Sequence, residues 1–131
     1  MDSKKTIIDY PKQAIKLIRP LITDYKKEHL MGIYLDSRYK VIKKELISLG
    51  IVDSHIVHPR EVFKPAIINS ASFIVLLHNH PSENVIPTNE DIEITKMLVK
   101  AGKILGIQLL DHIIFCKKVK EYCSFKVNKQ L

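Results

Sequence analysis

The stretch FIVLLHNHPSENVIPTNEDIEITKMLVKAGKILG, residues 73–106, contains the strand, loop and helix that decide the fold. It opens with FIVLLH at 73–78, an apolar run of strand length that is typical of a strand covered on both faces. A polar loop follows. Thr88 and Asp91 then resemble a capping box that begins a helix continuing to Gly106. The stretch therefore predicts a buried strand connected to a long helix.

The sequence before this stretch predicts a hairpin and two helices. LMGIYLD and VIKKELISLG, joined by DSRYK, indicate an antiparallel hairpin ending at Gly50, and IVDSHIV after it predicts a short third strand. An amphipathic helix is predicted at about residues 11–22, with a kink at Pro20. A second helix should run from Pro59 towards Asn69 and be irregular, because Pro65 lies inside it.

Residues 107–115, IQLLDHIIF, complete the pattern with a further apolar strand. Strands alternating with helices after an antiparallel hairpin predict the α/β class, as a single mixed-sheet α-β-α domain over residues 1–131. Its core should span about 29–116, followed by a basic C-terminal segment, 117–131, with a frayed end. The chain of 131 residues is 46% apolar and 27% charged, which suits one globular core without a structural metal.

The charge of the chain bears on its partners. Lys and Arg number 21 against 14 Asp and Glu, for a net charge of +7, but eighteen of the cations are Lys. Arg forks that grip phosphates are therefore scarce, and we expect only weak nonspecific nucleic-acid contact through a solvated lysine surface. No apolar run approaches the roughly 18 residues of a membrane span, and the start lacks a secretory signal, so we expect a cytoplasmic protein with no membrane contact. Cys116 and Cys123 lie outside any CxxC spacing and are assigned no chemistry.

Two histidines and one aspartate have the spacing of a metal site. His78 and His80 lie two positions apart at the predicted strand end, where side chains at i and i+2 point to the same face. Asp91 begins the next helix after a loop long enough to fold back. Two imidazoles and one carboxylate leave a fourth tetrahedral position for water, as in catalytic zinc sites. Two structural interpretations stay open, namely hydrogen-bonded core histidines and a simple helix cap at Asp91.

The order of these residues resembles a known motif. His78, His80 and Pro81 are followed by six residues and then by Thr88 and Asp91. This is similar to the H-x-H-P-x(6)-S/T-x-x-D motif of the JAMM (MPN+) metalloproteases. The resemblance implies the cytidine-deaminase-like architecture of those domains. Cytidine deaminases themselves are excluded, because the chain lacks their P-C-x-x-C sequence.

Three flanking sequences resemble the RadC branch of this family, over nearly the whole chain: HPREVFKPA at 58–66, HNHPS at 78–82 and LLDHIIF at 109–115. One departure lies in the loop, where Glu83 stands at a position commonly held by Gly in RadC proteins. Since Gly there often marks a left-handed backbone, either Glu83 or the neighbouring Asn84 must adopt that conformation. The helix-hairpin-helix region that commonly precedes this domain in longer RadC proteins is absent from this sequence.

The resemblance implies Zn²⁺ held by His78, His80 and Asp91, and an upstream glutamate acting as general base on the attacking water. Glu28, directly before the first strand, is our choice for the base. A solvated acid that balances neighbouring lysines is the alternative. Thr88 takes the place of the family's serine, whose hydroxyl stabilises the developing oxyanion.

We therefore expect a zinc-dependent hydrolase that cleaves a peptide or isopeptide amide in a protein or peptide substrate. Two alternatives stay open. One is a DNA-associated module, in keeping with the repair-linked name of the RadC family, and the other is a metal-free scaffold. Among the other histidines, His112 could approach the site but is expected to be a core residue, and His29, His55 and His58 are expected to be structural.

Overall fold

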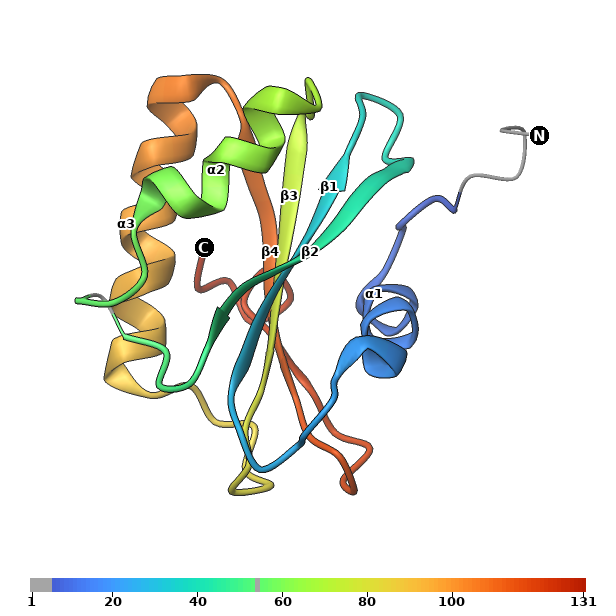
Figure 1. Ribbon diagram of the computed structural model, residues 1–131, viewed down its shortest axis with the longest axis vertical. Helices are drawn as coiled ribbons and strands as arrows, with labels where there is room; N and C mark the ends of the chain where they lie inside the picture. The colour runs from blue at the N-terminus through green and yellow to red at the C-terminus, as the bar shows by residue number, and fades with distance from the viewer. Residues whose placement is uncertain (1–5, 54) are drawn as a thin grey trace.

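The chain folds around a five-stranded sheet with strand order β2-β1-β3-β4-β5 (Figure 1). The computed structural model describes residues 6–53 and 55–131. In chain order its elements are α1 (Pro11–Ile18), the 3₁₀ helix η2 (Arg19–Leu21), β1 (His29–Leu35), β2 (Val41–Leu49), α2 (Pro59–Ile68), β3 (Phe73–Asn79), α3 (Asn89–Leu105), β4 (Gln108–Phe115) and β5 (Cys123–Ser124).

The sheet is mixed. β1 runs antiparallel to both β2 and β3, β3 and β4 are parallel neighbours joined through α3, and the short β5 pairs antiparallel with β4. β1 and β3 are buried along almost their whole length, as expected for central strands. The predicted hairpin and the predicted α/β class with a mixed sheet are confirmed.

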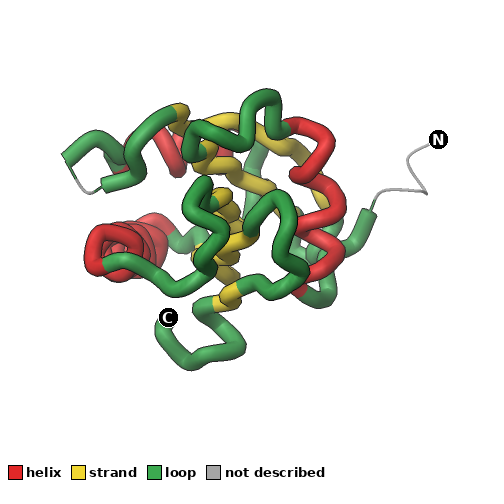
Figure 2. Tube along the Cα trace, turned by 90° about the horizontal axis from the view of Figure 1, so that it is seen from below, coloured by secondary structure: helices red, strands yellow, loops and turns green. Residues whose placement is uncertain are grey.

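Helices cover the two faces of the sheet. Leu30 and Tyr34 of β1 share a core cluster with apolar residues of α2 and α3, whereas Met31 and Ile33 share another with residues of α1. This alternation follows from the twofold period of a strand. Figure 2 shows the strands between α3 on one side and α1 on the other. Within the described residues, no helix is long and apolar enough to cross a membrane.

The predicted strand at IVDSHIV is wrong for the residues that the structure describes there. The Asp53 carboxylate accepts hydrogen bonds from the backbone amides of His55 and Ile56, at 2.8 and 3.0 Å, and so forms a turn in place of a strand. The helix predicted from Pro59 is present as α2, but it is continuous through Pro65. Near its end, the side chain and backbone amides of Asn69 both donate to the Pro65 carbonyl.

The C-terminal segment is packed where we expected a frayed end. β5 pairs with β4, and the Phe125 side chain is fully buried. Its ring stacks on His112 with centroids 4.7 Å apart. The Phe125 amide also donates to the His112 carbonyl. The buried residues Cys123, Ser124 and Phe125 thus anchor a basic segment that its place at the C-terminus led us to expect as a frayed end.

Candidate metal centre

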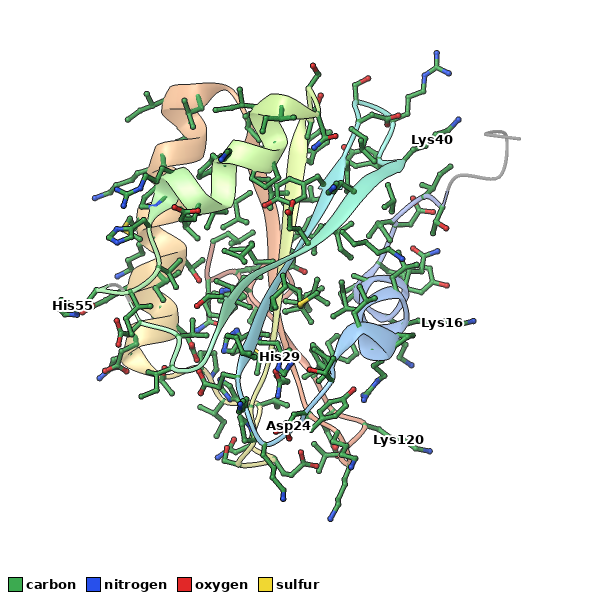
Figure 3. All side chains as sticks on the ribbon, in the orientation of Figure 1. Lys16, Asp24, His29, Lys40, His55 and Lys120 are labelled. Carbon is green, nitrogen blue, oxygen red and sulfur yellow. The ribbon has the colours of Figure 1, made fainter. Side chains whose placement is uncertain are left out.

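The candidate site lies where β3 ends, beside the beginning of β1. These two ends meet because β1 and β3 are antiparallel. Asn79, the last residue of β3, accepts a hydrogen bond from the His29 amide through its side-chain oxygen (2.7 Å) and donates to the Lys27 carbonyl (2.9 Å). His29 is labelled in Figure 3, in the lower half of the molecule. The Asn79 side chain therefore holds the chain entering β1 against the chain leaving β3.

His78, His80 and Asp91 come together at this end of the sheet, as the sequence predicted. All three are buried, and one ligand atom from each lies within 4.8 Å of the others. His78 Nε2 and His80 Nε2 are 2.9 Å apart. Asp91 Oδ1 lies 3.1 Å from His78 Nε2, and Asp91 Oδ2 lies 3.1 Å from His80 Nε2.

The chemistry of these atoms fits a divalent cation. His80 Nδ1 donates to the Asn84 carbonyl at 2.6 Å, so a neutral His80 turns the lone pair of its Nε2 towards the cluster. The Asp91 oxygens are acceptors as well. Ligands held roughly 2.0–2.2 Å from one tetrahedral zinc ion are about 3.3 Å apart, close to the separations above. The cluster therefore has ligand types and a spacing that are compatible with a divalent cation such as zinc.

Burial and mutual attraction shift the pKa values in the cluster. Burial by itself raises the pKa of Asp91. Hydrogen bonds from His78 and His80 outweigh burial and lower that pKa far below its usual value; these bonds require a proton on Nε2 of each ring, which a bound cation would displace. Burial lowers the pKa of His80, whereas the Asp91 hydrogen bond and the charges of Asp91 and Glu28 raise it, and the net effect is a rise. Both shifts show a carboxylate kept ionised beside imidazoles.

Asp91 also begins helix α3. The Thr88 hydroxyl accepts from the Asp91 amide at 3.2 Å, and Asp91 Oδ2 accepts from the Thr88 amide at 2.9 Å, which completes the predicted capping box. A carboxylate in the first turn is also favoured by the helix dipole. The helix cap and the approach to the histidines, which the sequence left as alternatives, therefore occur together.

Glu28 lies half-buried just before β1. Its Oε2 accepts from the Val52 amide at 2.9 Å, and its backbone carbonyl accepts from the Gly50 amide at 2.8 Å. Its charge contributes to the raised pKa of His80. Glu28 is therefore held in position by the chain that follows β2.

The loop between β3 and α3 contains the left-handed residue that the sequence predicts at position 83 or 84. Glu83 itself adopts the left-handed conformation, with φ of 63°, and Asn84 does not. The Glu83 carboxylate accepts from the backbone amides of Lys117, Lys118 and Val119 at 2.7 to 3.3 Å. Desolvation raises the pKa of Glu83, but these hydrogen bonds outweigh it, so the net effect is a lowered pKa. A left-handed backbone is costly for a residue that has a side chain. At this position the Glu83 side chain also connects the loop to the segment after β4 through these hydrogen bonds.

Sequence reasoning did not assign a role to His112 or Thr95. His112 Nε2 lies 2.8 Å from His78 Nδ1, and His112 Nδ1 lies 2.7 Å from the Thr95 hydroxyl. Both residues are buried. The pKa of His112 is lowered well below its ordinary value because complete burial disfavours the cation. The sequence did contain a signal for Thr95, because this residue follows Asp91 by one helical turn and so faces the same side of α3.

A mixed sheet between helices, with a His-His-Asp cluster where a strand ends and a helix begins, defines an α/β domain of the JAB/MPN class with a candidate metal site. The chain belongs to the RadC-like JAB domain family, whose model matches residues 8–130. The resemblance seen in the sequence is confirmed.

Several curated proteins named UPF0758 are similar to this chain. The relative from Methanococcoides burtonii is 47% identical over 113 residues, covering 86% of this chain and 49% of the relative. That from Syntrophomonas wolfei is 44% identical over 126 residues, covering 93% and 53%. That from Caldanaerobacter subterraneus is 50% identical over 104 residues, covering 79% and 45%. The chain therefore spans about half the length of the curated relatives it matches.

Proposed function

We propose that this chain is a zinc-dependent hydrolase that cleaves a peptide or isopeptide amide bond. One observation carries the proposal: His78, His80 and Asp91 direct ligand atoms at one point from two adjacent elements. Three protein ligands leave a fourth position open, the pattern of catalytic rather than structural zinc. The family adds support, because the JAB/MPN class includes metalloproteases.

Zinc bound there would supply a Lewis acid and lower the pKa of the attacking water. Glu28 is the proposed general base. A carboxylate has several acceptor positions, so Glu28 can take a proton while the Val52 amide stays bonded to Oε2. It would accept the proton from the attacking water and return it to the leaving amine.

Thr88 is the proposed donor to the developing oxyanion. Its hydroxyl oxygen is used as an acceptor by the Asp91 amide, and this bond does not consume the hydroxyl proton. The residue is exposed at the start of α3, where a substrate can reach it. A hydroxyl held in this way is oriented before the substrate arrives, which is the condition for effective oxyanion stabilisation.

Metal content tests the ligand set. Protein purified without chelator should contain about one zinc per chain, in keeping with a three-ligand site, and His80→Ala should contain none. His55→Ala is the matched control, because His55 is exposed on a loop (Figure 3). Zinc content that is unchanged in His80→Ala would refute the proposed site.

Amide hydrolysis tests the roles of the other two residues. With a library of peptides and isopeptide-linked peptides as substrates, Glu28→Gln should keep its zinc and lose activity by roughly a hundredfold or more. Thr88→Ala should reduce kcat by roughly a hundredfold, whereas Thr88→Ser should retain activity. Hydrolysis by Glu28→Gln at the wild-type rate would exclude Glu28 as the base.

A further inference from the structure

A chain of buried hydrogen bonds connects the backbone of α3 to the back of His78. The Thr95 hydroxyl lies 2.7 Å from the Asp91 carbonyl oxygen and 2.7 Å from His112 Nδ1. His112 Nε2 in turn lies 2.8 Å from His78 Nδ1. All four residues are buried, so water cannot replace any of these partners without entering the core.

The direction of each bond follows from counting protons. The Asp91 carbonyl can only accept, so the Thr95 hydroxyl donates its single proton there. The same hydroxyl can then only accept from His112, which makes His112 Nδ1 the donor. In a neutral imidazole one nitrogen donates and the other accepts, so His112 Nε2 must be an acceptor.

This reasoning fixes the tautomer of His78. With an acceptor at His112 Nε2, the proton of the 2.8 Å bond belongs to His78 Nδ1. A neutral His78 then directs the lone pair of its Nε2 towards His80 and Asp91. The opposite tautomer of His112 would reverse the direction of the hydrogen bond to His78. His78 would then carry its proton on Nε2, facing a cation, and could not coordinate it.

One further contact holds the His112 ring in place. Phe125 stacks on it with an interplanar angle of 15°. Thr95 lies one helical turn after Asp91 and bonds the carbonyl of that residue. The α3 segment that supplies one ligand, Asp91, therefore also sets the proton position on a second ligand, His78.

We propose that Thr95 and His112 are positioning residues that fix the tautomer and ring orientation of His78 for binding a divalent cation. The inference rests on the metal site under the proposed function. Outer hydrogen-bond partners of this kind change metal affinity by roughly 10–100-fold when they are removed. In this role neither Thr95 nor His112 contacts the cation or the substrate.

The first test measures the tautomers directly in metal-free wild-type protein, from the ¹⁵N chemical shifts of the imidazoles. We expect His112 to carry its proton on Nδ1 and not on Nε2, and His78 to carry a proton on Nδ1. His112 protonated on Nε2, alone or together with Nδ1, would overturn the inference. This measurement needs no variant and no bound metal.

The second test measures the zinc dissociation constant by competition with a chromophoric chelator. Thr95→Val removes the hydroxyl at nearly constant volume and should weaken zinc binding by roughly 10–100-fold. Thr95→Ser keeps the hydroxyl and should retain the wild-type affinity. Thr23→Val is the matched control, because the Thr23 hydroxyl contacts a different histidine, His29.

The outcomes separate this inference from the proposed function. Wild-type affinity in Thr95→Val would overturn the positioning role and leave the metal site intact. A wild-type protein that binds no zinc would overturn both. Weak binding in Thr95→Val together with the expected tautomers in the wild type would support the inference, and rescue by Thr95→Ser distinguishes a hydrogen-bond effect from damage to the core.

Discussion

The two carboxylate oxygens of Asp91 contact both the helix cap at Thr88 and the imidazoles of His78 and His80. Oδ2 accepts from the Thr88 amide and lies beside His80, while Oδ1 faces His78. Because the cap fixes the side chain as soon as α3 forms, little rotamer freedom is left to lose when a cation binds. The cap thus prepares the ligand.

Asp111 is a second buried carboxylate, with different surroundings. Burial is the main cause that raises its pKa, against hydrogen bonds from the Ser124 hydroxyl and the amides of Lys126 and His112. Oδ1 receives both amide bonds, so the Asp111→Asn side chain can keep them through its own oxygen. Its amide group can then donate to the Ser124 hydroxyl.

Asp111→Asn should change how stability depends on pH. The raised pKa means that folded wild-type protein holds this proton more tightly than the unfolded chain, so wild-type stability falls as pH rises from below 3.8 through the raised pKa. Asp111→Asn has no carboxyl group to titrate at this position, so it lacks this loss of stability with rising pH. The free energy of unfolding of Asp111→Asn relative to wild type, from urea titrations, should therefore be more favourable at neutral pH than in acid below 3.8.

Asp24→Asn is the matched control, since Asp24 is exposed (Figure 3) and its carboxylate bonds the Lys26 amide two residues on. Its relative stability should change less between the two pH values. A relative stability of Asp111→Asn that is equal at both pH values, or higher in acid, would contradict the assigned cause.

The meeting of the three candidate ligands was predictable because their positions depend on local geometry. A strand places His78 and His80 on one face, and the helix signal at Thr88 places Asp91 in a first turn. The part played by His112 was not predictable in the same way. It depends on the register of β4 against β3, which pairs His112 with Leu76 and so leaves it diagonal to His78. Register between distant strands is a property of the assembled sheet.

At the scale of elements, the junction of α3 and β4 depends on close backbone approach. Gly102 lies inside α3, and a Cβ on it would lie 2.3 Å from the Ile107 carbonyl oxygen. The Gly102 carbonyl accepts from the Ile107 amide at 2.9 Å, and Gly106 ends the helix in the left-handed conformation. The turn is therefore too tight for any side chain at residue 102.

Gly102→Ala should destabilise the protein. Helix propensity alone would make alanine more stable by about 1 kcal/mol. We expect the contact with the Ile107 carbonyl to reverse that sign and to lower the free energy of unfolding by roughly 1–3 kcal/mol. Urea denaturation measures the difference. Lys103→Ala, at the next and exposed position, should be nearly neutral, and a stabilised Gly102→Ala would show that the turn can relax.

The elements themselves were predicted well where hydrophobic periodicity or capping residues were strong, as in β3 and α3. The errors occurred where side chains bond to the backbone. Asp53 forms a turn within a stretch that reads as a strand, and the Val52 amide bonds the Glu28 carboxylate. In the C-terminal segment, the buried residues Cys123, Ser124 and Phe125 hold the chain against β4 despite the lysines around them.

At the scale of the whole molecule, the candidate site joins parts of the chain that are far apart in sequence. His78 comes from β3 and His80 directly follows it, Asp91 comes from α3, and the proposed base, Glu28, directly precedes β1. Ligands that converge in this way exist as a set only in the folded state, so a cation that binds them stabilises the fold by mass action.

Zinc should therefore raise the thermal stability of the wild-type protein. Free zinc at a hundredfold excess over its dissociation constant adds roughly 2.7 kcal/mol to the free energy of unfolding. This should appear as a rise of several degrees in the Tm measured by calorimetry, reversed by EDTA. His80→Ala should show no such rise, and an equal rise in that variant would indicate binding elsewhere on the molecule.

The contact between Phe125 and His112 bears on the order in which the site is completed during biosynthesis. All three ligands leave the ribosome before Phe125 does, because they precede it in the chain. The ring that packs over His112 arrives only with the segment after β4. The packing around His112, which bonds His78, is therefore completed only after the three candidate ligands have been synthesised.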